Sequence, residues 1–301
     1  MEPLFTKQQF LDDCRAEATR MTGIVSAMTG RRVCLQLDDD FGPRGLTEKL
    51  SSGGYRITLN ELDLLVPCHD FLLPALAAYH ARNAHRLDVT LQLFSRMAVT
   101  CCYLMALWHE AAHVIRGHMD YMDKHKVLPE RGWIEDEVSF ARWPGPYVVG
   151  LLPAQMLEID ADIYGGQFLL AQLVVAKEAV EEIDIESFIE AFVLGVRGLS
   201  QYLNGGGQYH AAADEPHPHP ITRAYITLTH SLVRLEEMWA RGKVDRLVRT
   251  GFSALLEFER MELGFAVDAA ELQRFADTAL AVWRRRSDEL FPYQLVRRQG
   301  T

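Results

Sequence analysis

A chain of 301 residues with 49% hydrophobic and 24% charged residues has the balance of a folded globular protein and excludes a disordered one. The formal net charge of -10 disfavours nucleic-acid binding, which usually needs a basic surface, so no nucleic-acid partner is expected. Five cysteines without a Cys-x-x-Cys pair exclude a disulfide framework and a zinc ribbon, and they favour a reducing, cytoplasmic location.

The N-terminal sequence predicts one helix followed by two short strands. Apolar residues at helical spacing indicate a helix over 5–29. Apolar and polar residues alternate over 33–37 and 55–59, which predicts a strand in each place, and the Gly- and Ser-rich segment between them is predicted to be a loop.

The rest of the chain predicts helices. Their expected ranges are 87–119, 153–179, 185–203, a helix from Pro220, 245–261 and 268–290. The fold class is therefore mostly α (α+β), with a small N-terminal β-sheet. The start of the chain lacks the features of a signal peptide, and no apolar run reaches the roughly 18 residues of a membrane helix, so no membrane span is expected.

The first of these helices carries the motif His109-Glu110-Ala111-Ala112-His113. Residues four apart lie on one helix face, so both imidazoles can bind one metal ion. The adjacent Glu110 can then take a proton from a metal-bound water, whose pKa zinc lowers to about 7. Apolar residues surround the motif, and buried histidines and carboxylates are costly without partners. The pattern predicts a zinc site rather than a surface helix.

A third protein ligand must come from elsewhere in the chain. Glu158 and Asp162 lie four apart on the 153–179 helix, so Glu158 is predicted as the ligand and Asp162 as the acceptor that orients a ligand imidazole. Asp160 is interpreted as a solvated residue. His118 lies about 180° around its helix from His109, so it is expected to bind a backbone carbonyl instead.

This set of residues resembles the gluzincin peptidases, and in particular the family of the CaaX prenyl protease and the HtpX heat-shock protease. The resemblance covers about residues 104–224 and rests on H-E-x-x-H followed by Glu158-x-x-Ala161-Asp162. It implies a zincin-like helical core. We expect the chain to divide into residues 1–60, the N-terminal helix and strands of the catalytic domain, 61–240, the helical peptidase core, and 241–301, a C-terminal helical extension. A weaker similarity to the phage-exclusion peptidase Lit implies a host protein as substrate.

The same family carries a His-Pro segment with an arginine six residues after the histidine, which His217 and Arg223 match. The resemblance implies catalytic roles for both. His217 could stabilise the oxyanion, act as a reversible fourth zinc ligand, or be an ordinary loop residue. Arg223 falls in the first turn of a helix, where the helix dipole disfavours a cation, so we expect it to have an anionic partner.

Two functions follow from these residues. The first is a zinc-dependent endopeptidase that acts on an intracellular protein or peptide, with strand 55–59 as the sheet edge to which an extended substrate adds. The second is a non-catalytic zinc-bearing scaffold or regulator that binds a protein partner. All ligand and base positions are filled, which favours the enzyme.

Overall fold

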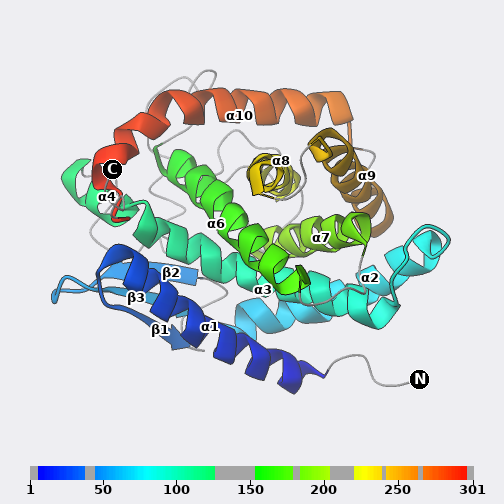
Figure 1. Ribbon diagram of the computed structural model, residues 1–301, viewed down its shortest axis with the longest axis horizontal. Coiled ribbons are helices and arrows are strands. Elements are labelled where there is room, and N and C mark those ends of the chain that lie inside the picture. The colour runs from blue at the N-terminus through cyan, green and yellow to red at the C-terminus, as the bar shows by residue number, and fades with distance from the viewer. Residues whose placement is uncertain are drawn as a thin grey trace.

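The computed structural model describes residues 6–37, 45–125, 153–178, 184–203, 220–238, 242–263 and 267–296. The three strands are β1 (Val33–Leu37), β2 (Gly45–Lys49) and β3 (Tyr55–Leu59). The helices are α1 (Lys7–Thr29), α2 (Val66–Asn83), α3 (Leu91–Ile115), α4 (His118–His125), α6 (Pro153–Glu178), α7 (Ile185–Leu203), α8 (Pro220–Met238), α9 (Val244–Leu263) and α10 (Ala269–Leu290) (Figure 1). The expectation of a mostly helical chain with a small N-terminal sheet is confirmed.

The sheet has the order β1-β3-β2, with β1 parallel and β2 antiparallel to β3. The two predicted strands, 33–37 and 55–59, have the observed bounds. Two expectations about the sheet were wrong. Residues 45–49 form a strand rather than part of a loop, and β3 is the central strand rather than the edge. The edge that lies beside α3 is β2, whose residues contact that helix.

Helix α3 runs through the middle of the molecule, with α1 and the sheet on one side and α6 and α7 on the other (Figure 1). Nearly every residue from Phe94 to Ile115 is buried, which explains why its apolar residues occupy more than one face. An 18-residue window of α3 has a mean hydropathy of 1.3 and is 67% buried inside the protein. This is weak evidence for a membrane span, because the core helix of a soluble protein has the same profile.

The helix predicted over 87–119 is interrupted. Helix α3 ends at Ile115, and α4 begins at His118. Between them Gly117 adopts a φ of 70°, the left-handed conformation that commonly ends helices and that glycine adopts without strain. The turn redirects the chain so that His118 faces back toward the motif on α3, a position that a continuous helix would not give it.

The glycine pair of α6 lies where this helix packs closely against two others. Helix α6 is continuous from Pro153 to Glu178 across this pair. A Cβ on Gly165 would lie 2.9 Å from the backbone nitrogen of His109, and one on Gly166 would lie 2.4 Å from Cγ2 of Thr227. The two glycines therefore allow α6 to approach α3 and α8, and Gly165 does so at the first residue of the motif.

One apolar core connects the described elements from α1 to α10. It includes Phe10 of α1, Phe94 of α3, Phe192 of α7 and Leu290 of α10. All five cysteines are free, and Cys101 and Cys102 are buried. The site described below thus lies against a core to which the N-terminal and C-terminal parts both contribute.

Candidate metal centre

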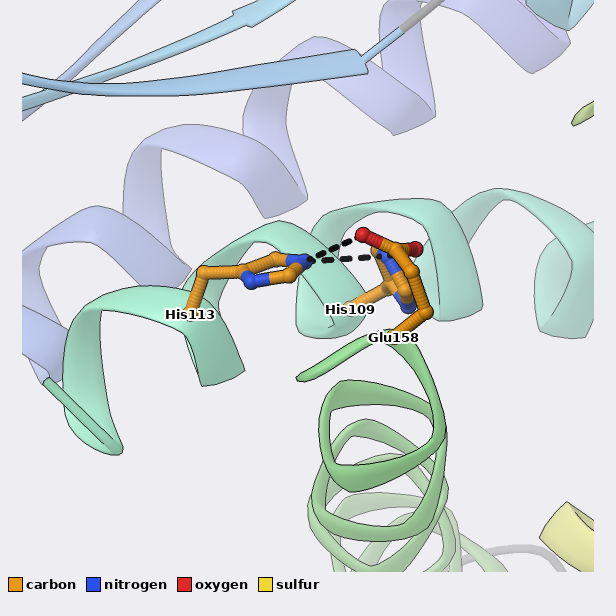
Figure 2. A group of neighbouring side chains, drawn as sticks. All are labelled: His109, His113 and Glu158. Atoms are coloured by element: carbon orange, nitrogen blue, oxygen red, sulfur yellow. Dashed lines mark hydrogen bonds and ion pairs between the residues drawn. The ribbon is translucent and has the colours of Figure 1, made fainter. Parts of the chain in front are cut away.

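Three buried side chains from two helices point their donor atoms at one another (Figure 2). His109 and His113 come from α3, and Glu158 comes from α6. The Nε2 atoms of the two histidines are 3.2 Å apart. Glu158 Oε2 lies 3.1 Å from Nε2 of His109, and Oε1 lies 3.6 Å from Nε2 of His113. The structure therefore brings together the three residues that the sequence predicts as metal ligands.

The spacing of these donors fits a small divalent ion. In a tetrahedral site with metal–donor distances of about 2.0–2.2 Å, neighbouring donors lie about 3.3–3.6 Å apart. The observed separations of 3.1, 3.2 and 3.6 Å are close to this range. Imidazole nitrogen suits zinc, iron, copper and nickel, and carboxylate oxygen completes a common zinc set. The residues present fit a first-row divalent metal.

Asp162 orients the first of the two histidines. Its Oδ1 lies 2.9 Å from Nδ1 of His109, the contact that the sequence predicted for it. The Nδ1–H of His109 donates to Asp162, so Nε2 faces the other donors. Arg223 in turn holds Asp162 with two hydrogen bonds, from Nε at 2.6 Å and Nη2 at 2.8 Å. Asp162 is thus the anionic partner expected for Arg223, while His217 lies outside the described residues.

Two interpretations of the residues behind His113 were wrong. Asp160 is fully buried rather than solvated, and Arg116 binds it through Nε at 2.7 Å and Nη2 at 3.1 Å. His118 contacts two side chains rather than a backbone carbonyl. Its Nε2 lies 2.9 Å from Asp160 Oδ2, and its Nδ1 lies 2.8 Å from Nδ1 of His113. Trp283 of α10 also donates to Asp160, at 2.8 Å.

The buried charges of this cluster do not balance. In the described part of the chain, four carboxylates and two guanidinium groups lie within it, which leaves two negative charges if every carboxylate is ionised; the residues are Glu110, Glu158, Asp160, Asp162, Arg116 and Arg223. Uncompensated charge is very costly in a protein interior. A divalent cation at the His109–His113–Glu158 site would cancel it.

When no metal is bound, protons can offset the excess negative charge of the cluster, and the pKa directions indicate which groups carry them. Burial opposes a charge on His109, but Glu158 and Asp162 raise its pKa to about 10. Burial raises the pKa of Glu110 to about 7, although His109 and Thr47 act against it. Burial holds the pKa of His113 well below its usual value. A metal would displace the proton between His109 and Glu158, because ligands must be deprotonated to bind.

Glu110 is held in place by strand β2. The hydroxyl of Thr47 donates to Glu110 Oε2 at 2.8 Å and also lies 3.0 Å from the carbonyl oxygen of Glu110. Two residues earlier, a Cβ on Gly45 would lie only 2.6 Å from Oε1 of Glu110. Side chains two apart in a strand share a face. On this face of β2, the hydroxyl of Thr47 therefore holds Oε2 of Glu110, and the absence of a side chain on Gly45 leaves room for Oε1.

If Glu110 is the base in the hydrolysis proposed below, Thr47→Val should lower kcat by roughly 10- to 100-fold, because small displacements of a reacting group have effects of this size. The valine keeps the shape of threonine but cannot donate to Glu110. Thr47→Ser retains the hydroxyl and should keep most of the activity. Thr58→Val on β3 is the matched control. Thr58 is also a buried threonine, but it pairs with Leu46, so its side chain lies on the opposite face of the sheet from that of Thr47. Parental kcat in Thr47→Val would contradict this positioning.

Sequence reasoning missed Thr47, Arg116, His118, Asp160 and Trp283 as parts of this cluster. On a continuous helix, the nine-residue separation places His118 on the opposite face from His109. Only the turn at Gly117, which ends the helix between them, allows His118 to lie near the motif. The others come from elements that meet only in the fold. No protein-family model, curated protein or solved structure matches this chain, so the case for its function rests on the site itself.

Proposed function

We propose that this protein is a zinc-dependent endopeptidase of the gluzincin type, with a zincin-like core, that cleaves an intracellular protein. The observation that carries the proposal is the buried set of His109, His113 and Glu158 with the glutamate of the same motif, Glu110, beside it. A site that only binds metal does not require a further buried carboxylate next to its ligands. A hydrolytic site requires one as a base.

The proposed reaction uses Glu110 twice. A bound zinc ion would lower the pKa of a water molecule and polarise the scissile carbonyl. Glu110 takes a proton from the attacking water as the new C–O bond forms, and the proton then passes to the leaving amine nitrogen as the C–N bond breaks. Thr47 holds Oε2 of Glu110, so Oε1 is the oxygen that carries this proton.

The sheet edge beside Glu110 offers a place for the substrate backbone. In the part of the chain that the structure describes, β2 pairs only with β3, so its other edge has no strand partner. An extended peptide can add to such an edge through main-chain hydrogen bonds. Because Gly45 and Thr47 of the same strand contact Glu110, a peptide on this edge would lie close to the proposed base. The free cysteines are consistent with a cytoplasmic protein.

A non-catalytic zinc-bearing scaffold is the second candidate, and the burial of the ligands favours it. His109, His113 and Glu158 are 4–7% exposed, and structural zinc sites are closed whereas catalytic sites keep an open position. A proteome-derived peptide library separates the two functions. Incubation with the zinc-loaded protein should produce new termini that are missing with Glu110→Gln and with the metal-depleted protein. If the zinc-loaded protein leaves the library uncleaved, the endopeptidase is excluded and the scaffold function is favoured.

A further inference from the structure

His113 has a partner on the side away from the other ligands. Its Nε2 points toward His109 and Glu158 (Figure 2). Its Nδ1 lies 2.8 Å from Nδ1 of His118. The opposite nitrogen of His118, Nε2, lies 2.9 Å from Oδ2 of Asp160. The carboxylate and the two rings thus form a chain that ends at the proposed metal. Asp162 and His109 form the corresponding, shorter chain on the other side.

The hydrogen bonds in this chain run in one direction. Asp160 is ionised against Arg116 and can only accept, so Nε2 of His118 carries a proton. The Nδ1 of a neutral His118 is then an acceptor, and the Nδ1 of His113 must donate to it. A neutral imidazole has one N–H, so Nε2 of His113 has a lone pair and no proton. This is the form that binds a metal.

Asp160 is fixed from several elements. Arg116, at the end of α3, contacts both of its oxygens, and Trp283 of α10 donates to Oδ1. The guanidinium of Arg116 lies 3.9 Å from the centre of the Tyr164 ring, which restrains the arginine as well. The carboxylate therefore has little freedom to rotate away from His118. The C-terminal helix, expected from the sequence to be an extension, takes part in this arrangement through Trp283.

We propose that Asp160 and His118 are positioning residues for His113, which hold its ring with the Nε2 lone pair directed at the metal. The inference rests on the proposed metal site. A metal-ligating histidine usually donates its other N–H to a carboxylate, a carbonyl or water. Here a second imidazole transmits that role from Asp160. Loss of the relay should weaken metal binding even where the protein remains folded.

The first test measures the zinc affinity of His118→Phe by competition with a chromophoric chelator. Phenylalanine keeps a ring but has no nitrogen, so the affinity should fall roughly 10–100-fold, as the loss of such outer contacts normally causes. His118→Asn, whose amide can still accept from His113, should lose less. His69→Phe is the matched control, because His69 is buried on α2 and stacks on Phe10. An affinity for His118→Phe equal to that of the control would overturn the relay.

The second test needs no substitution. Long-range proton–nitrogen NMR spectra of the parent protein report which nitrogen of His113 carries its proton. The relay predicts a proton on Nδ1, protected from exchange with water, both with and without zinc. A proton on Nε2 in the metal-free protein would overturn the relay whatever happens to the variants. If the parent binds no divalent metal, the proposed function fails, whereas the proton position still decides whether the relay exists.

Discussion

Glu110→Gln is expected to retain the metal and the fold and to lose peptide hydrolysis. Glutamine has nearly the same shape as glutamate, but its amide cannot accept a proton from water at neutral pH. General bases contribute roughly 10²–10⁴-fold to enzymatic rates, so kcat should fall by that factor with little change in KM. In the metal-free protein the amide also replaces a carboxylate whose charge burial already disfavours, so the variant should still fold before it binds metal.

The measurement is steady-state hydrolysis of a peptide found in the library screen, together with metal content. Glu48→Gln is a suitable control, because Glu48 lies on β2 but pairs with Arg56 rather than facing Glu110. Unchanged turnover in Glu110→Gln would rule out Glu110 as the base. Loss of the metal in this variant would show instead that Glu110 is a ligand.

Glu158 and Asp162 should respond differently to removal. Glu158→Ala deletes a donor of the three-residue set, so most of the metal should be lost on dialysis. Asp162→Ala leaves all three donors in place and removes the acceptor of the His109 N–H, so the affinity should fall by only about 10–100-fold. Zinc binding by both variants can be followed by competition with a chelator.

Asp162 also binds Arg223, so the experiment must distinguish a loss of metal affinity from a loss of folding stability. Its removal leaves the buried Arg223 without its main partner, and breaking a buried ion pair from one side typically costs about 3–5 kcal/mol. Affinity should therefore be measured on protein that far-ultraviolet circular dichroism shows to be folded, with Asp162→Asn as the less disruptive variant. The two roles are reversed if Asp162→Asn releases the zinc while Glu158→Ala keeps it.

Most helices could be predicted from the sequence because each has a long periodic pattern, as in 185–203, where the bounds agree with α7. Strand β2 could not. Its sequence, Gly-Leu-Thr-Glu-Lys, has a glycine and two charged residues in five positions, which is common on edge strands and resembles a loop. The end of α3 was missed because apolar residues continue past Gly117, whose left-handed conformation ends the helix.

The ligands could be predicted because their spacing within each helix is fixed by helix geometry. His109 and His113 lie one turn apart, as do Glu158 and Asp162. The partners of Asp160 could not be predicted in this way. Arg116, His118 and Trp283 lie 44, 42 and 123 residues from it in the chain, and only the packing of α3, α4, α6 and α10 brings them together. An acidic residue between apolar neighbours was a sign of burial that the interpretation of Asp160 did not use.

The metal content of the purified chain is the most direct test of the His109–His113–Glu158 site. Protein exchanged into metal-free buffer after zinc loading should retain about one zinc per chain by mass spectrometry, as a three-ligand site predicts. His109→Ala and His113→Ala should each retain almost none, while His69→Phe should retain as much as the parent. Full zinc content in both ligand variants, or a parent chain that binds no divalent metal, would contradict the site.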